Sequence, residues 1–504
     1  MAKKKKSRTL FALLLVLVLL IGAYVCYVIY DGKQVEQESS NTIEDDAIQI
    51  LSIEAENIQS IYYKNNQAEL TLVKNSEDAW VIESNQEIPL NSTYTSKMAS
   101  TVENLTASKI VVENAEDLSQ YGLTNPTVTV IVKKVDGSQE TLYIGDNSPL
   151  SDGYYACLEG SSSVYLVDTS VYSAYNYNES SLITVASAPT MEAGTITHLL
   201  VEDQETGVLE ITYDAENEYD YSNTGNAPYV LNQAYTSPVS GDTTNITTYL
   251  GNFTSLTYTE CVEYNSEDFA KYGIDNASTK ITVDYYEDVE VQSEADTEAD
   301  SEDSSTTQTE RNYYQYVLLI GNLDEANSVY YVKELDSNSI YTMSQSIVEG
   351  MLNYHRFELA SKYAQIVNVK SVDQVDVSFS GDTHSLAIKH TTTTDEDGNE
   401  EEVDVFYLDG TEYDESKART IYQTLISPMY NAEIPEGYND SNKEPVVTFT
   451  FKRTDESGKA DIVSEYREYD ESFYTVTVNG VELFLVDKRD IQTAMKAIQG
   501  QVSE

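Results

Sequence analysis

The sequence predicts an α+β protein: three tandem repeats of a mostly antiparallel sheet with one packed helix each, behind one N-terminal transmembrane helix. Three observations support this prediction. They are an uncharged run near the N-terminus, short β-type runs that recur in the same order, and 41 tyrosines against one tryptophan in 504 residues. Tyrosine favours strands, and a chain of this length holds roughly three domains of about 150 residues.

The N-terminus has the pattern of a membrane anchor. Residues 1–9 contain the basic cluster Lys3 to Arg8, and residues 10–30 contain the uncharged run from Leu10 to Ile29. A helix over that run spans roughly 30 Å, the thickness of a bilayer's hydrocarbon core. Because basic flanks stay on the cytoplasmic side, we expect a single-pass protein of the cell membrane with a cytoplasmic tail and the bulk of the chain extracellular.

A cleaved signal peptide is the competing interpretation. Its apolar region would cover about 7–15 residues and end at a small-x-small cleavage site. The run here is longer, and Tyr24-Val25-Cys26-Tyr27 provides no such site. We therefore expect a retained anchor, followed by a polar and acidic stalk over residues 31–47.

Internal repetition organises the rest of the chain. Tyr121-Gly122 and Tyr272-Gly273 each precede a β-type run, and Ile144-Gly145 and Ile320-Gly321 follow in the same order. Matched motifs of this kind define three repeat units, which cover residues 48–195, 196–364 and 365–504.

The second and third copies each depart from the first. The second carries an insert, residues 287–310, with ten acidic residues and no basic residue before Arg311, and we expect a disordered hairpin loop there. The third is diverged and lacks the Tyr-Gly pair. Pro445 and Asp487 nevertheless match Pro126 and Asp168 of the first copy at the same separation.

Each unit is predicted to begin with strands and to end with a short helix. In the first unit, apolar alternation predicts strands over residues 58–63, 69–73 and 80–83. After a helix, four more strands complete the unit, and a short helix such as residues 170–175 closes it. The result is one helix laid on a twisted antiparallel sheet.

The main helix of each unit is predicted from apolar residues spaced three or four positions apart, which share one helix face. These residues are Tyr94, Met98, Val102 and Leu105; Ile246, Leu250, Phe253 and Leu256; and Ala418, Ile421, Leu425 and Met429. Asn91, Asp242 and Asp414 lie just ahead of the helices and are predicted N-caps.

Four ordered motifs resemble those of the domain of unknown function 4340 family. They are Tyr121–Pro126, Tyr143–Asp146, Tyr154–Ala156 and Val164–Val167. The resemblance covers residues 48–365 and extends only weakly over 366–504. It implies a bacterial extracytoplasmic protein behind one membrane helix, without established catalytic residues, and often encoded beside an ABC transporter of the gliding-motility type.

Charge excludes one class of partner. The chain has 30 Lys and Arg against 85 Asp and Glu, a net charge of -55. Such a surface repels phosphate backbones, so we expect no nucleic-acid partner.

The residues predict no catalytic, cofactor-binding or metal site. His198, His355, His384 and His390 lack metal-ligand spacing, and no nucleophile elbow or phosphate-binding loop is present. The acidic segment Asp395–Glu402 lacks the regular spacing of a calcium loop, so a solvated hairpin tip is the preferred interpretation and weak calcium binding is the alternative.

Cysteines and tyrosine pairs allow two interpretations each. Cys157 and Cys261 lie in different units, which favours buried free thiols over a disulfide. Adjacent tyrosines place one ring on each face of a strand; the pairs are 154–155, 285–286, 313–314 and 330–331. These rings either pack against their own sheet or form a stacking surface for carbohydrate or peptide.

We therefore expect a non-enzymatic, membrane-anchored extracytoplasmic protein. By the family resemblance, it is an accessory component of an ABC transport system of the gliding-motility type, with permease and ATPase subunits as partners. The alternative is a cell-surface binding or spacer protein for wall polymers or glycans.

Overall fold

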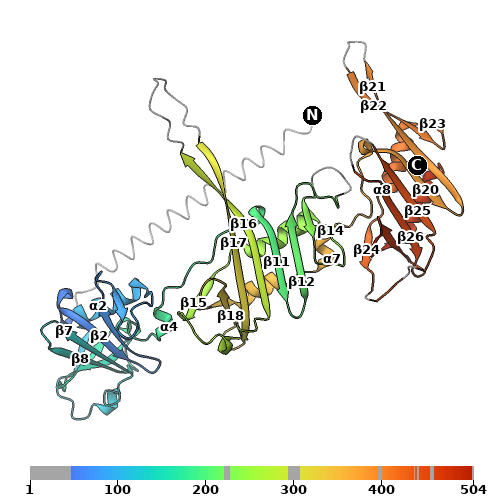
Figure 1. Ribbon diagram of the computed structural model, residues 1–504. Coiled ribbons are helices and arrows are strands. Elements are labelled where there is room, and N and C mark those ends of the chain that lie inside the picture. The colour runs from blue at the N-terminus through green and yellow to red at the C-terminus, as the bar shows by residue number, and fades with distance from the viewer. Residues whose placement is uncertain are drawn as a thin grey trace, which may run out of the picture. The chain divides into compact units, whose positions relative to one another are not determined.

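The computed structural model describes residues 47–501 except for 221–226, 293–306, 395–399, 436, 440–441 and 455–458 (Figure 1). The predicted tail (1–9), the predicted anchor (10–30) and nearly all of the predicted stalk (31–47) lie outside the described residues. Within the described part of the chain, no helix is both long enough and apolar enough to cross a membrane.

The described chain consists mostly of antiparallel β-sheets with few helices, an α+β architecture. It divides into two compact units, the first ending at Thr184 and the second beginning at Val185. The first unit contains one large sheet and the second contains two. A separate two-stranded sheet pairs β1 (Ile48–Ser52) with β5 (Asn104–Ala107).

The three large sheets contain eight, nine and nine strands, which follow one another in space in a shared pattern. The first contains β4 (Trp80–Ile82), β3 (Glu69–Lys74), β2 (Ile58–Lys64), β7 (Val128–Lys134), β8 (Gln139–Asn147), β9 (Tyr154–Leu158), β10 (Val164–Val167) and β6 (Lys109–Val112). The second contains β14 (Val239–Ser240), β13 (Tyr229–Leu231), β12 (Gly207–Tyr213), β11 (Ile196–Asp203), β16 (Thr279–Gln292), β17 (Thr307–Asp324), β18 (Val329–Glu334), β19 (Ile340–Ser344) and β15 (Tyr258–Glu263). The third contains β23 (Thr411–Tyr413), β22 (Glu400–Leu408), β21 (Asp382–Thr394), β20 (Val372–Phe379), β25 (Val447–Arg453), β26 (Ile462–Glu468), β27 (Phe473–Val478), β28 (Val481–Asp487) and β24 (Tyr430–Glu433). The second and third sheets have the same connectivity, and the first differs only in lacking the edge strand that corresponds to β14 and β23.

In chain order, one main helix separates the earlier strands of each large sheet from the later ones, and one or two further helices follow the last strand. The α-helices of the described chain are α2 (Ser92–Glu103), α3 (Thr169–Ser173), α4 (Glu179–Leu182), α5 (Thr243–Leu250), α6 (Gln345–Leu352), α7 (Arg356–Leu359), α8 (Glu415–Ile426) and α9 (Lys488–Ile498). In the third sheet, Ile421 of α8 and Ile491 of α9 are both buried in one core with Phe449 of β25. The expectation of one packed helix per sheet was therefore too low, because the closing helix also contributes core residues.

The predicted N-caps are confirmed. Asn91 Oδ1 accepts a hydrogen bond from the Thr93 backbone N–H, and Asp242 and Asp414 do the same for residues three positions ahead. These side chains satisfy backbone donors that the first helical turn leaves unpaired.

The helices end earlier than predicted. Leu105 lies in β5, while Leu256 and Met429 follow the ends of α5 and α8. Leu105 and Leu256 are buried, so they extend the apolar spacing past their helices, whereas Met429 is exposed. In each large sheet, five strands follow the main helix where four were expected; they are β6 to β10, β15 to β19 and β24 to β28.

A bulge recurs at the start of the central strand pair of each large sheet. The register of β2 with β7 shifts between Ile58 and Ser60, and the shift recurs at Ile196 and His198 in β11 and at Val372 and Gln374 in β20. A bulge re-aims the side chains that follow it and bends the strand. All three sheets therefore begin with the same local geometry.

The repeated glycines are required by a close backbone approach. Gly122 ends a 3₁₀ turn (Ser119–Tyr121) at φ 71°, and a Cβ on Gly145 would collide with the carbonyl oxygen of Tyr121. Gly321 has the same relation to the carbonyl oxygen of Tyr272. The motif glycines therefore allow a turn to pack directly on a neighbouring strand.

These glycines coincide with a second bulge. The register of β8 with β9 shifts between Ile144 and Asn147, and that of β17 with β18 shifts between Ile320 and Leu323. The corresponding pair in the third sheet, β26 with β27, runs without a register shift. The third sheet thus lacks both the motif glycines and the bulge that they accompany.

Part of the acidic insert is strand, where the sequence predicted a disordered loop. Residues 287–292 and 307–310, expected in a disordered loop, continue β16 and β17, with Glu287 opposite Asn312 and Gln292 opposite Thr307. Cross-strand pairing stabilises this part despite its charge. The rest of the predicted insert lies outside the described residues.

The glycine geometry predicts a large steric cost for Gly145→Ala. The added methyl group would meet backbone that cannot move aside, so we expect the free energy of unfolding of the first unit to fall by about 3 kcal/mol. Urea unfolding followed by fluorescence of Trp80, the one tryptophan of the chain, measures this. Gly137→Ala is the control, because it has a positive φ but no heavy atom near the new methyl group; it should cost only about 1 kcal/mol. Equal losses in the two variants would contradict the steric explanation.

Candidate functional site

His198 ties together the three central strands of the second sheet. Its Nδ1 lies 3.0 Å from Oδ2 of Asp284 on β16, and its Nε2 lies 3.0 Å from Oε1 of Glu210 on β12. Gln315 and Gln233 donate hydrogen bonds to the second oxygen of each carboxylate. Because both ring nitrogens face acceptors, a doubly protonated ring satisfies both contacts at once. The arrangement is a cross-strand tie within one sheet.

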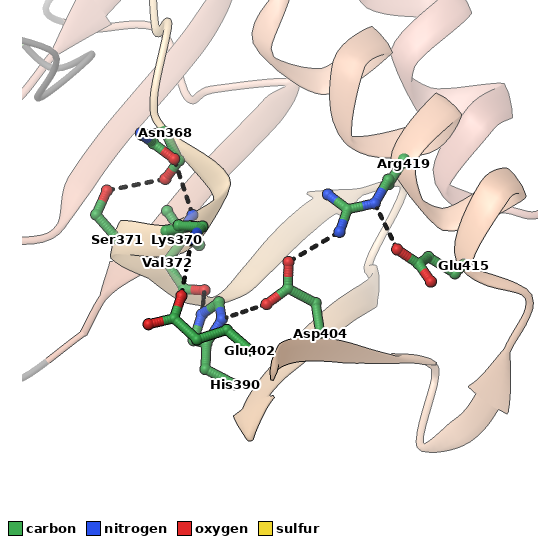
Figure 2. A network of polar contacts seen from close by, with 9 residues as sticks. All are labelled: Asn368, Lys370, Ser371, Val372, His390, Glu402, Asp404, Glu415 and Arg419. Atoms are coloured by element: carbon green, nitrogen blue, oxygen red, sulfur yellow. Dashed lines mark hydrogen bonds and ion pairs between the residues drawn. The ribbon is translucent and has the colours of Figure 1, made fainter. Parts of the chain in front are cut away.

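A second histidine network joins the third sheet to its main helix (Figure 2). His390 Nδ1 lies 2.8 Å from Asp404 Oδ1, and its Nε2 lies 3.1 Å from the carbonyl oxygen of Val372. Arg419 of α8 donates to Asp404 Oδ2 at 3.0 Å and to Glu415 at 2.8 Å. The Asp404 carboxylate therefore connects β21, β22 and α8.

Asp404 is the least exposed ionisable side chain of this network. Its side chain is 12% exposed. Burial alone would raise its pKa, but the hydrogen bonds from His390 and Arg419 outweigh burial, and the pKa of Asp404 is lowered. Lys370, in the 3₁₀ turn Val369–Ser371 ahead of β20, pairs with Glu402 of β22 at 2.8 Å (Figure 2). The network is a structural ion-pair cluster, held by groups that a substrate would have to displace.

The other two histidines lie apart from any such network. His384 pairs with Asp409 at 2.9 Å, next to the ring of Phe379. His355 is exposed and precedes α7. The four histidines of the sequence are thus distributed over separate positions, and they do not assemble into one site.

The acidic segment considered for calcium lies mostly outside the described residues. Asp395 to Asn399 are not described, while Glu400 to Glu402 lie on β22. Among the described residues, no group of three or more His, Cys, Asp or Glu side chains is arranged to hold a metal ion.

Cys157 and Cys261 are buried free thiols. They lie on non-equivalent strands, β9 and β15. Burial raises the pKa of both thiols, that of Cys261 to about 11. Neither thiol is therefore activated as a nucleophile.

A cavity of about 540 Å³ is the candidate ligand site of the second unit. Segment 360–364 forms one of its walls. This segment pairs through Ala360 with Gly241, beside β14, and through Tyr363 with Met429, ahead of β24. It thereby connects the second sheet to the third, and the cavity lies where the two sheets meet.

The lining of the cavity combines rings, aliphatic side chains and charges of both signs. Its residues are Glu216, Glu218, Tyr219, Asp220, Pro238, Val239, Ser240, Ser361, Tyr363, Ile366, Tyr430, Arg453, Lys459, Ala460, Val476, Val478, Asn479, Val481 and Phe484. Arg453 is 6% exposed, and its burial lowers the pKa of its guanidinium, a shift that Tyr422 and Asp220 oppose. Cavities of about 300–1,000 Å³ with such mixed linings bind small molecules.

Most of the paired tyrosines pack against rings of the helices and turns that lie on their own sheets. Tyr154 stacks on Tyr172 at a centroid distance of 4.1 Å, and Tyr155 meets Tyr121 at 5.0 Å. Tyr331 meets Tyr272 in the same way in the second sheet. The interpretation as packing groups therefore holds for these rings.

Comparison with known protein families identifies the family of this chain. A family model described as Domain of unknown function (DUF4340) matches residues 80–235 and 234–428. The chain belongs to the DUF4340 family. Comparison with curated proteins and with solved structures finds no match.

The two DUF4340 matches are offset from the sheets. The first begins at β4 and ends after β13, so it takes in the later strands of one sheet and the first strands of the next. The second runs from before β14 to the end of α8. Both matches contain a pair of motif glycines with its close backbone approach, so these DUF4340 motifs have a structural role in this chain.

Sequence reasoning missed the carboxylate partners of the histidines and the cavity. The partners of His198 lie 12 and 86 residues away, and no short motif joins them. Alternation alone could have placed His198 and Asp284 on one face, once β11 and β16 were known to pair.

The lowered pKa of Asp404 predicts a pH-dependent contribution to stability. At pH 7, we expect Asp404→Asn to lower the free energy of unfolding by about 1–3 kcal/mol, because His390 and Arg419 lose their charged partner. A carboxyl with a lowered folded-state pKa stabilises the fold above its unfolded pKa of about 3.9 and loses this effect as the pH falls through the folded value. The difference between the two proteins should therefore begin to shrink below about pH 4 and vanish only below the folded-state pKa of Asp404.

Denaturant unfolding between pH 3 and pH 8 measures this difference. Glu415→Gln is the control, since it removes the exposed partner of Arg419 within one helix and should cost at most about 0.5 kcal/mol. A loss in Asp404→Asn that stays constant down to pH 3 would show that the carboxylate charge does not carry the effect.

Proposed function

We propose that this protein is a non-enzymatic, membrane-anchored extracytoplasmic component of an ABC transport system, with the permease and ATPase subunits as its partners. The observation that carries the proposal is a series of three sheets of one strand connectivity behind a basic cluster and a twenty-residue uncharged run. Such a series offers several similar surfaces to one partner.

The proposal includes an origin by triplication. The recurring strand order, the recurring bulge of the central pair and the matched N-caps support three copies of one unit. The glycine motifs, present in two copies, fit the stronger divergence of the third.

The ionisable groups favour a binding role over catalysis. His198 and His390 each contact a carboxylate from a neighbouring strand, and His384 contacts Asp409 in the turn after β22. Cys157 and Cys261, the two cysteines of the described chain, are buried with raised pKa values. Side chains held in this way stabilise the fold. A catalytic side chain, by contrast, must be free to contact a substrate.

A second candidate function follows from the cavity. Its rings, Tyr219, Tyr363, Tyr430 and Phe484, and its volume suit a binding protein for wall polymers or glycans, because flat rings stack on sugars. In that case, soluble wall fragments should protect the full chain against thermal unfolding.

The proposed topology predicts opposite labelling on the two sides of the anchor. In intact protoplasts, a membrane-impermeant maleimide should label Glu54→Cys, because Glu54 is exposed and follows the proposed anchor. Ser7→Cys should be labelled only after permeabilisation. The native Cys157 and Cys261 are buried and should contribute little background. Labelling of Ser7→Cys in intact cells would overturn the topology.

The transporter proposal predicts a specific set of partners. Crosslinking of the full chain in intact membranes, followed by affinity purification, should recover a permease and an ATPase subunit. The control replaces residues 10–30 with the membrane helix of an unrelated single-pass protein, which keeps the tether and removes its sequence. Recovery should persist if the extracytoplasmic sheets make the contact. Absence of both subunits from the wild-type sample would sink the proposal.

A further inference from the structure

Strands β16 and β17 extend beyond the second sheet as a two-stranded arm (Figure 1). β11 pairs with β16 only as far as Tyr285, and β18 pairs with β17 from Leu318 onward, yet β16 and β17 stay paired up to Gln292 and Thr307. Among the described residues, 286–292 and 307–313 therefore pair only with each other. Both outer edges of the arm keep backbone groups that can accept a further strand.

Closing the sheet does not require this arm. In the first sheet, the equivalent strands β7 and β8 meet at a short turn, where the Lys134 backbone N–H donates to Ser138 O at 2.8 Å. The pair Lys133–Gln139 in that sheet corresponds to the pair Asp284–Gln315 in the second. The arm is thus an addition to a hairpin that closes without it.

The two faces of the arm differ in exposure. On the core face, at the base of the arm, Tyr285 and Tyr314 stack at a centroid distance of 5.5 Å; Tyr285 is 6% exposed and packs on the core, while Tyr314 is 42% exposed. On the other face, Tyr286 and Tyr313 lie opposite each other, and Tyr313 is 69% exposed. The adjacent tyrosines therefore divide into a packing pair and an outward pair.

The outward pair is held in place by a charged network. The Arg311 guanidinium lies 3.7 Å from the centroid of the Tyr286 ring and donates two hydrogen bonds to Asp288, at 2.9 and 3.1 Å. A ring fixed in this way loses little conformational freedom on binding, and exposed tyrosine beside arginine is typical of interaction hot spots.

Charge selects the kind of partner. The described part of the arm carries four carboxylates, Glu287, Asp288, Glu290 and Glu310, and one cation, Arg311, which Asp288 already neutralises. The whole chain carries -55. An approaching basic segment is therefore steered toward the arm, and its lysine or arginine side chains can lie over the Tyr313 ring.

We propose that the arm is a docking element for a basic, extended segment of a partner protein, which adds to a free edge as a strand. Backbone hydrogen bonds to the edge supply affinity, and the outward tyrosines and flanking carboxylates select lysine and arginine. The inference does not depend on the transporter proposal, because the same chemistry applies whichever protein supplies the segment.

The test uses two synthetic heptapeptides, Lys-Thr-Lys-Val-Lys-Thr-Lys and its counterpart with Glu for Lys, titrated into the full chain by calorimetry at low salt. The lysine peptide should bind and the glutamate peptide should not. Replacing residues 286–313 with the first sheet's Val-Asp-Gly turn should weaken binding at least about tenfold. Tyr313→Ala should weaken it about five- to tenfold and, as an exposed position, leaves thermal unfolding unchanged.

The control shortens the hairpin of β21 and β22 by replacing residues 393–401 with Asn-Gly. This change removes five acidic residues but no aromatic ring, so lysine-peptide binding should persist. Three results would overturn the proposal: unchanged binding in both arm variants, equal binding of the two peptides, or equal losses in the control. Arm-dependent self-association in sedimentation without peptide would also overturn it, since a second copy would then be the occupant.

Discussion

Each large sheet depends on one pairing between strands that are far apart in the chain. The first strand of the sheet pairs with a later strand from beyond the main helix, as in Ile61 of β2 with Val132 of β7, Val201 of β11 with Ile281 of β16 and Val375 of β20 with Phe451 of β25. The other strands of these sheets join mostly through short connections to this central pair. Its register decides which side chains face the helix, because a slip of one residue would turn every core residue toward solvent. The bulge that recurs at the start of the central pair fixes this register.

Local features of the fold could be predicted because they depend on nearby residues. The strands of the first unit and the three N-caps follow from alternation and from one polar residue ahead of an apolar run. The helix ends could not be read in the same way. Leu105, Leu256 and Met429 keep the helical spacing, but each lies beyond its helix.

Features that depend on distant residues escaped prediction. Composition argued against strands after Tyr286, yet Arg311 reaches back to Asp288 and to the Tyr286 ring and stabilises the pairing there. The cavity could not be predicted either, because its lining comes from segments that are far apart in the sequence and meet only in the folded second unit. The same reason hid the carboxylates around His198 and His390.

The central pairing also sets the order in which the chain can fold. Its two strands are roughly 70 to 80 residues apart, so a newly made chain exposes the first hairpin of each sheet long before the closing strand arrives. Contacts of this range make folding slow and leave strand edges open to wrong partners, including the equivalent strands of a neighbouring sheet. Three sheets of one connectivity in a single chain thus carry an inherent risk of exchanging strands. Differences between them, such as the diverged third sheet, reduce that risk because a mismatched strand fits its neighbours less well.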